Sequence, residues 1–224
     1  MTPTLLETVE IETGPKPTAS IIWMHGLGAD GHDFEPVVPH VASAVKHSMR
    51  FVFPHAPMRS VTLNAGMRMR AWYDILGLEQ RSVQDEIGFR ASSEAISALI
   101  KRENERGIET SRTVLAGFSQ GGAMSLYMAA RYPQKLAGII ALSCYLPLAT
   151  KFDAERLVVN QTTPIFLAHG SMDAMIDERR GVESRELLEA AGYSVEWHSY
   201  PMGHAVCGEE IAAISVFLQR VLSA

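Results

Sequence analysis

The chain has 224 residues, of which 47% are hydrophobic and 20% are charged, and this composition is typical of a folded globular protein. Its 20 Lys and Arg residues and 25 Asp and Glu residues give a net charge of −5, so a basic surface for binding nucleic acid is not expected. Its two cysteines, Cys144 and Cys207, are too few for a disulfide framework and are expected to be free thiols in the cytoplasm.

Six short, largely apolar runs are predicted to form strands of one sheet, because such runs are typical of parallel strands buried on both faces. In chain order they cover residues 21–24, 51–53, 113–116, 138–142, 164–168 and 194–198. The last run alternates, which places it nearer an edge. Helical patterns cover residues 34–46, 83–106, 120–131, 178–190 and 209–221. This alternation over residues 1–224 predicts a single α/β domain with a doubly wound, mostly parallel sheet flanked by helices.

Residues 54–82 form a long connection without strong periodicity. Long irregular loops in a compact domain are uncommon and usually functional, so we expect this segment to form one wall of a substrate site. Its candidate substrate-binding residues are Met67, Met69, Trp72, Leu76 and Leu78, although packing against the sheet would explain each of them equally well.

No segment is predicted to enter a membrane or to direct secretion. The N-terminus has no basic region followed by an apolar run. The most apolar stretch, residues 137–148, is much shorter than the ~20 residues that a spanning helix needs.

The strongest chemical signal is Gly117-Phe118-Ser119-Gln120-Gly121, which fits the pattern Gly-x-Ser-x-Gly. The pattern is weak as a string, but here a predicted strand leads into it and a predicted helix leaves it. In such a turn the serine has a strained backbone that exposes its hydroxyl, and glycines let the helix approach the strand. We therefore predict that Ser119 is a nucleophile rather than an ordinary turn serine.

A serine nucleophile needs a histidine base. In an α/β-hydrolase sheet the chain order is serine, acid, histidine, which excludes the five histidines before Ser119. His169 precedes any suitable acid, and His198 lies inside a predicted strand. His204, in the loop after that strand, is therefore the predicted base.

The base needs a carboxylate that orients its ring. Two candidates follow the strand at residues 164–168. Asp173 lies in the loop itself, whereas Asp177 directly precedes the next predicted helix and is better placed as its N-cap. Asp173 is the predicted acid.

Two backbone N–H groups are predicted to stabilise the oxyanion, those of Gln120 and of Leu27, with Gly28 as the next candidate. Leu27 lies in a glycine-rich turn that also fits Gly-x-Gly-x-x-Gly. No acidic residue ends the second strand to hold a ribose, so a nucleotide cofactor is not expected. A metal is not expected either, because the sequence has no His-Glu-x-x-His and no Cys-x-x-Cys motif.

Several of these segments together resemble the small carboxylesterase/acyl-protein thioesterase family of α/β-hydrolases. They are His25-Gly-Leu-Gly-Ala-Asp-Gly31, Pro54-His-Ala-Pro57, Arg70-Ala-Trp-Tyr-Asp74, Gly117-Phe-Ser-Gln-Gly-Gly122, His169-Gly-Ser-Met-Asp173 and Gly203-His204. The resemblance covers almost the whole chain. It implies a single-domain serine hydrolase without a lid, often dimeric, with the triad Ser119, Asp173 and His204 and an oxyanion hole at Leu27 and Gln120. One departure is Ala174-Met-Ile-Asp177, where the family commonly has Val-Val or Leu-Val followed by Pro.

The expected function is therefore a cytoplasmic serine carboxylesterase that needs no cofactor, forms an acyl-Ser119 intermediate and also cleaves thioesters. A narrower alternative is a dedicated acyl-protein thioesterase or lysophospholipase, with an acylated protein or a lysophospholipid as substrate. Another is a non-catalytic member that uses the fold only for binding. The complete triad argues against this last alternative, and a homodimer is the expected assembly.

Overall fold

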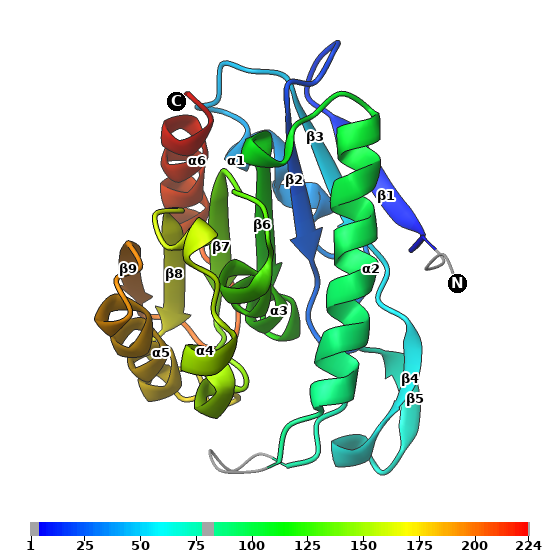
Figure 1. The fold of residues 1–224 in the computed structure, drawn as a ribbon, viewed down its shortest axis with the longest axis vertical. Helices are drawn as coiled ribbons and strands as arrows, with labels where there is room; N and C mark the ends of the chain where they lie inside the picture. The colour runs from blue at the N-terminus through cyan, green and yellow to red at the C-terminus, as the bar shows by residue number, and fades with distance from the viewer. Residues whose placement is uncertain (1–4, 78–82, 224) are drawn as a thin grey trace.

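The computed structural model describes residues 5–77 and 83–223. Their centre is a seven-stranded sheet with the strand order β1-β3-β2-β6-β7-β8-β9 (Figure 1). The strands are β1 (Thr8–Glu12), β2 (Ala19–Met24), β3 (Met49–Pro54), β6 (Thr113–Phe118), β7 (Gly138–Leu142), β8 (Ile165–Gly170) and β9 (Val195–Tyr200). Only β1 runs antiparallel to its neighbour. The predicted α/β fold with a mostly parallel sheet is confirmed.

Burial along the strands follows their place in the sheet. Every residue of β2, β3, β7 and β8 is buried, as near-continuous apolar runs predict for strands covered on both faces. The two edge strands, β1 and β9, consist of half-buried and exposed residues. The edge position that alternation predicted for residues 194–198 is confirmed.

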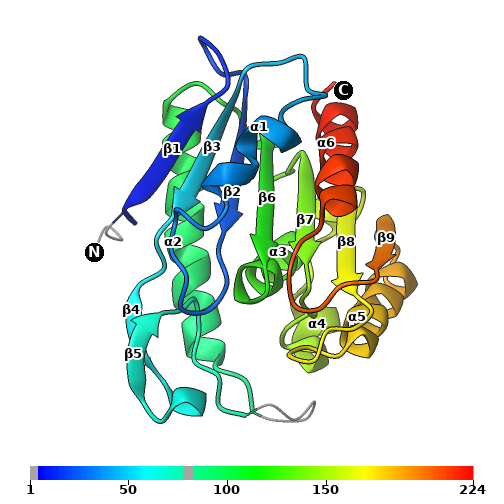
Figure 2. The ribbon, with the colours of Figure 1, turned by 180° about the vertical axis from the view of Figure 1, so that it is seen from behind.

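Helices cover both faces of the sheet (Figures 1 and 2). On one face lie α2 (Glu86–Glu105), α3 (Gln120–Arg131), α4 (Ala149–Glu155) and α5 (Glu178–Ala190), and on the other lie α1 (Val38–Val41) and α6 (Gly208–Leu222). The bounds of α3 and α5 are those that the sequence predicted. Each face has its own hydrophobic core, with Phe89 and Leu126 in one and Trp23 and Phe217 in the other. None of the helices that the structure describes is long and apolar enough to cross a membrane.

The helix predicted over residues 34–46 was wrong. Only Glu35–Val37, one turn of 3-10 helix, and the single turn of α1 are helical there. Each of these turns has a proline, Pro36 or Pro39, as its second residue. Proline fits the first turn of a helix but breaks a helix interior, so the two prolines divide the apolar pattern into short pieces.

The expectation of an irregular segment at residues 54–82 was wrong for residues 58–70, whereas residues 71–77 form no helix or strand. It contains an antiparallel hairpin of β4 (Met58–Val61) and β5 (Met67–Arg70), joined by a 3-10 turn at Thr62–Asn64. At the end of this turn Ala65 and Gly66 have φ angles of 53° and 76°, the left-handed conformation that reverses the chain. Leu78, expected to line a groove, lies outside the described residues.

Two further elements, β1 and α4, were not predicted. β1 contributes only the partly buried Val9 and Ile11 to the core, and Phe152 is the buried residue of α4. Such short elements carry too few apolar positions to define a period.

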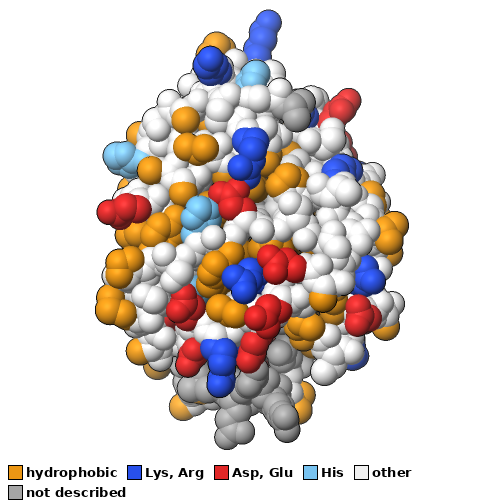
Figure 3. Space-filling model, turned by 90° about the vertical axis from the view of Figure 1, so that its left-hand side faces the viewer, with side chains coloured by type: hydrophobic (Ala, Val, Ile, Leu, Met, Phe, Trp, Pro, Cys, Tyr) orange, Lys and Arg blue, Asp and Glu red, His pale blue; other side chains and the backbone are white. Residues whose placement is uncertain are grey.

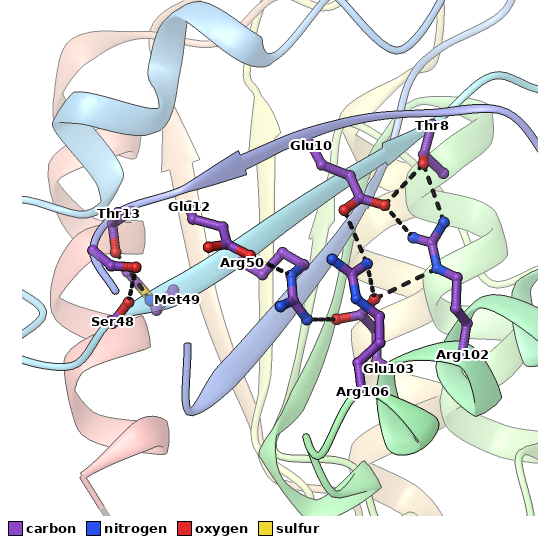
Figure 4. A network of polar contacts seen from close by, with 11 residues as sticks. Thr8, Glu10, Glu12, Thr13, Ser48, Met49, Arg50, Arg102, Glu103 and Arg106 are labelled. Carbon is purple, nitrogen blue, oxygen red and sulfur yellow. Dashed lines mark hydrogen bonds and ion pairs between the residues drawn. The ribbon is translucent and has the colours of Figure 1, made fainter. Parts of the chain in front are cut away.

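A cluster of charged side chains joins β1 and β3 to the C-terminal part of α2 (Figure 4). Glu103 of α2 is fully buried and accepts hydrogen bonds from Arg50 at 2.8 Å and Arg106 at 3.0 Å. Arg50 also donates to Glu12 at 2.9 Å, and Arg106 to Glu10 at 2.9 Å. Opposite charges therefore hold this helix end against the edge of the sheet.

The strand order reverses between β2 and β6. From β2 the chain moves outward to β3, and it returns to β6 on the other side of β2 before continuing to β9. In open α/β sheets, ligands bind outside the carboxyl ends of the strands at such a point. The register pairs Met24 with Gly117, so the turns that follow β2 and β6 lie side by side.

Candidate active site

Ser119 occupies the turn between β6 and α3 with φ 54° and ψ −117°, a strained conformation for a residue with a side chain. Its N–H donates to the carbonyl of Leu142 in β7 at 2.9 Å. A Cβ at Gly117 would lie 2.2 Å from the carbonyl carbon of Gly121, and one at Gly121 would lie 2.1 Å from the carbonyl oxygen of Met24. Both positions therefore require glycine, as the sequence pattern indicated.

The structure brings the three predicted triad residues together. His204 Nε2 lies 2.9 Å from Ser119 Oγ, and His204 Nδ1 lies 2.7 Å from Asp173 Oδ2. The side chain of Asp173 is fully buried, and its other oxygen accepts N–H bonds from Met175 at 2.8 Å and Ile176 at 2.9 Å. Because a carboxylate can only accept here, Nδ1 carries the proton and Nε2 is free to accept from the serine.

The loops that carry Asp173 and His204 are bound to each other. The N–H of Met172 donates to the carbonyl of Met202 at 3.0 Å. A Cβ at Gly170 would lie 2.4 Å from the carbonyl oxygens of both Met202 and Gly203. Only glycine allows this approach. The acid and the base therefore follow two different strands, but their loops contact each other directly.

The residues rejected as triad members have other partners. Asp177 accepts from the N–H of Arg179 at 2.9 Å and caps α5, as predicted. The ring of His198 lies 2.8 Å from a carboxylate oxygen of Glu196 on the same strand.

His169 binds the loop that carries the acid, a role that the sequence did not indicate. It is fully buried, with Nε2 2.8 Å from the carbonyl oxygen of Ile176 and 3.5 Å from Asp173 Oδ2. Burial lowers the pKa of His169, so the ring is neutral and Nε2 donates to that carbonyl. His169 therefore fixes the end of the loop that carries the acid.

The predicted oxyanion donors lie beside the serine. Among the hydrogen bonds of the described part of the chain, none uses the N–H of Leu27 or of Gln120 as donor. The N–H of Gly28, in contrast, donates to the carbonyl of Arg70 in β5 at 2.9 Å. Of the two candidates in this turn, Leu27 is therefore the one left available to an oxyanion.

His25 holds this turn in place. Its Nε2 accepts from the N–H of Ala56 at 3.1 Å, so Nδ1 carries the proton and donates to the carbonyl of Gly26 at 2.7 Å. Burial lowers the pKa of His25 to about 4, which keeps the ring neutral and this pair of bonds intact at neutral pH. The indole N–H of Trp72 donates to the His25 carbonyl at 2.9 Å.

A cavity of about 580 Å³ opens around Ser119 and His204, within the usual size of small-molecule sites. Of the described residues that line it, Arg180 is the one arginine or lysine and Asp33 the one acidic residue. Its walls are largely apolar and include Leu63, Met69, Ile75, Met175 and Ile176. This lining suits the hydrocarbon part of an acyl group.

Of the four predicted substrate-binding residues that the structure describes, only Met69 lines this cavity. The prediction for Trp72 was wrong, because the residue is fully buried and its N–H donates to the side chain of Gln120 at 3.0 Å, behind the wall. Met67 lies at the hairpin turn and is 65% exposed, and Leu76 borders an adjoining crevice instead.

Several cavity residues were not predicted. Met175 and Ile176 lie two and three residues after the acid, and this proximity was a usable signal in the sequence. Leu63, Tyr145 and Arg180 come from three different segments, and only the folded chain brings them to one cavity.

Comparisons with known proteins agree with this geometry. The sequence pattern of the phospholipase/carboxylesterase family matches residues 6–222. Acyl-protein thioesterase 1 of Neurospora crassa is 41% identical over 214 residues, which cover 92% of this chain and 87% of that protein. The crystal structure of SOBER1 from Arabidopsis thaliana is 30% identical, with a TM-score of 0.85 over 91% of this chain and 99% of that one. Acyl-protein thioesterase 2 of Zea mays is 26% identical, with a TM-score of 0.83 over 96% and 99%.

Proposed function

Since the chain belongs to the phospholipase/carboxylesterase family and is a carboxylic ester hydrolase with thioesterase activity, we propose that Ser119, His204 and Asp173 are its catalytic residues. The observation that carries this proposal is the pair of contacts from Asp173 through His204 to the Ser119 hydroxyl, 2.7 and 2.9 Å long, at the wall of an apolar cavity. Both lengths are normal for hydrogen bonds.

In the first half of the reaction Ser119 Oγ attacks the substrate carbonyl while His204 Nε2 takes its proton. The carbonyl oxygen becomes negative and accepts hydrogen bonds from the N–H groups of Leu27 and Gln120. Asp173 stabilises the imidazolium that forms. His204 then protonates the departing alcohol or thiol, and the acyl group stays on Ser119.

In the second half a water molecule replaces the leaving group. His204 removes a proton from this water as it attacks the acyl carbonyl, the same two N–H groups stabilise the oxyanion, and the proton returns to Ser119 as the acid leaves. Neither half requires a metal or an organic cofactor, because every proton and charge has a group in the chain that handles it.

We propose that the substrates are small acyl esters and thioesters, with lysophospholipids or acylated proteins as natural donors of the acyl group. The apolar walls favour a hydrocarbon chain, and the similarity to proteins named acyl-protein thioesterase supports the thioester. We place the protein in the cytoplasm, where its thiols Cys144 and Cys207, both free in the structure, would stay reduced.

A second copy of the chain is proposed to cover part of the surface around the cavity. Met175, which lines the cavity, is 72% exposed, and Met58 and Met67 on the neighbouring hairpin segment are 50% and 65% exposed; exposed apolar surface of this kind is often covered by a partner. Light scattering is expected to give twice the mass of one chain. A monomer at every concentration contradicts this assembly.

A fluorophosphonate probe, which labels activated serines, tests the catalytic assignment. The wild-type chain should be labelled at Ser119, and Ser119→Ala should lose both labelling and ester hydrolysis while unfolding at the same temperature. Ser111→Ala is the matched control, because this exposed serine lies in the 3-10 turn Thr110–Arg112, away from the cavity. Equal labelling of wild type and Ser119→Ala refutes the assignment.

A further inference from the structure

One end of the cavity contains a guanidinium group, that of Arg180, which has no carboxylate partner in the described part of the chain. Arg180 is the third residue of α5, and its guanidinium carbon lies 3.6 Å from the centre of the Tyr145 ring. None of the ion pairs among the described residues includes Arg180, whereas the preceding Arg179 lies 3.6 Å from Glu183. A half-buried guanidinium whose N–H groups face a cavity is a ready site for an anion.

Arg180 lies at the end of the cavity that meets a smaller crevice. This crevice shares with the cavity Tyr73, Ile75, Gly77, Tyr145 and Arg180. Neither Ser119 nor His204 borders this crevice. The described lining of the cavity includes the apolar side chains of Leu63, Met69 and Ile75.

Among the described residues around Arg180, none is a carboxylate free to pair with it. The two described carboxylates that border the adjoining crevice are bound elsewhere: Asp74 accepts from the N–H and the hydroxyl of Thr62, and Asp85 accepts from the N–H groups of Asp74 and Gly88. Burial raises the pKa of the Tyr73 hydroxyl, and the positive charge of Arg180 opposes this rise, which places the guanidinium within electrostatic reach of that hydroxyl.

We propose that Arg180 is a specificity-determining residue that binds a carboxylate at the far end of the acyl chain. The preferred substrates are then esters or thioesters of dicarboxylic acids with one free carboxylate, separated from the scissile carbonyl by a short hydrocarbon spacer. This inference rests on the proposed function, since it requires the acyl group to be attached to Ser119.

The acyl part of the substrate is the part that points toward Arg180. The leaving group must lie beside His204 Nε2, which protonates it, and the carbonyl oxygen must lie at the N–H of Gln120. The end of the cavity that meets the crevice lies on the Gln120 side of the site, because the side chain of Gln120 donates to the carbonyl of Tyr73 at 2.9 Å. A chain that leaves the carbonyl away from His204 therefore runs toward Tyr73 and Arg180.

The other charges near the site orient such a substrate. Asp33 borders the cavity but not the crevice, so it lies away from the Arg180 end and repels the carboxylate toward it. Acidic and basic side chains are interspersed on the face of the molecule at the β9 edge, where α5 also lies (Figure 3). With no broad basic surface on this face, attraction of the anion depends on Arg180 itself.

The test compares two p-nitrophenyl esters with the same glutaryl chain: in one the second carboxylate is free, and in the other it is a neutral methyl ester. Both are measured on wild type, Arg180→Gln, Arg180→Lys and Arg179→Gln. We expect kcat/KM of the wild type to be at least about tenfold higher for the free carboxylate. Arg180→Gln should lose about 10- to 100-fold on that substrate, the range of a charge-assisted hydrogen bond, and less than about threefold on the neutral one. Arg180→Lys should retain part of the preference.

Arg179→Gln is the matched control, because it removes the neighbouring charge without touching the cavity and should leave both rates unchanged. Equal rates for both esters in the wild type, or an equal loss on both in a folded Arg180→Gln, overturn the anion site while hydrolysis through Ser119 stands. A third substrate, a butyrate ester whose alcohol carries the carboxylate, tests the direction: an Arg180-dependent preference there overturns the acyl-side placement. Failure of the proposed function is distinct, since Ser119→Ala would then hydrolyse all three esters.

Discussion

Asp173 and Asp177 lie four residues apart in one loop, but their carboxylates have different tasks. Asp173 is fully buried and bonds to His204 at 2.7 Å, whereas Asp177 is exposed and bonds only to the start of α5. The chemistry of each residue is therefore set by its partners and not by its type.

Substitution of these two residues should separate activity from stability. Asp173→Asn should reduce kcat by about 10⁴-fold with little change in melting temperature, because the imidazole then adopts the wrong tautomer. Asp177→Ala should lose about 0.5–2 kcal/mol of unfolding free energy, the usual value of an N-cap, and keep most of its activity. Ester hydrolysis and urea unfolding measure the two effects, and exchanged phenotypes would make Asp177 the acid.

At the scale of elements, the charged cluster of Figure 4 decides how α2 is held at the edge of the sheet. Glu103 is fully buried between arginines of two elements, whereas Glu12, at the rim of the same cluster, is 44% exposed. Removing one partner from a buried ion pair leaves the other charge uncompensated, and an exposed pair contributes little.

Glu103→Gln should therefore lower the free energy of unfolding by about 3–5 kcal/mol, and Glu12→Gln by less than about 1 kcal/mol. The cluster lies at β1, the start of β3 and the end of α2, away from the carboxyl ends of the strands that carry the site. The kcat of the folded Glu103→Gln enzyme should stay within about threefold of wild type. Similar unfolding curves for the two variants would mean that the cluster does not hold the helix.

At the scale of the whole molecule, one buried carboxyl makes stability depend on pH. Glu210, in the first turn of α6, is fully buried, and no arginine, lysine or histidine of the described residues forms an ion pair with it. Burial raises the pKa of Glu210 from its ordinary value of 4.5 to about 8, and the backbone of Cys207 opposes this rise in part. The native state thus holds a proton that the unfolded chain has already released.

The contribution of Glu210 to the free energy of unfolding should therefore be greatest below pH 4.5. It should decline as the pH rises from 4.5 toward 8. The decline is about 1.4 kcal/mol per pH unit in this window. Glu210→Gln has no proton to release and should remove this decline, which urea unfolding at pH 5, 6, 7 and 8 can measure. Parallel curves for wild type and variant would show that Glu210 does not titrate in this range.

The order of strands and helices followed from the sequence because each long element has a clear period and its own turn residues. The bounds of α3 and α5 could be predicted for this reason, and so could the residues that follow each strand, including Ser119, Asp173 and His204. Short elements could not be predicted: Pro36 and Pro39 interrupt an apolar pattern that otherwise suits one helix.

The cavity walls were the least predictable part of the site. Trp72 looked like a ligand contact, but its buried indole supports the turn at His25 instead. Arg180 was missed because nothing within α5 distinguishes it from Arg179; only the position of Tyr145, in another segment, does so. Residues that act through long-range contacts leave no local signal.

The hairpin of β4 and β5 forms no part of the seven-stranded sheet, yet the segment around it supplies Leu63, Met69 and Ile75 to the cavity. The triad residues follow strands of the sheet, whereas part of the cavity wall belongs to this separate hairpin segment. Selection during evolution can therefore alter the hairpin and change which esters fit, while the strands that position Ser119 stay as they are. An enzyme built in this way can acquire a new substrate without rebuilding its catalytic machinery.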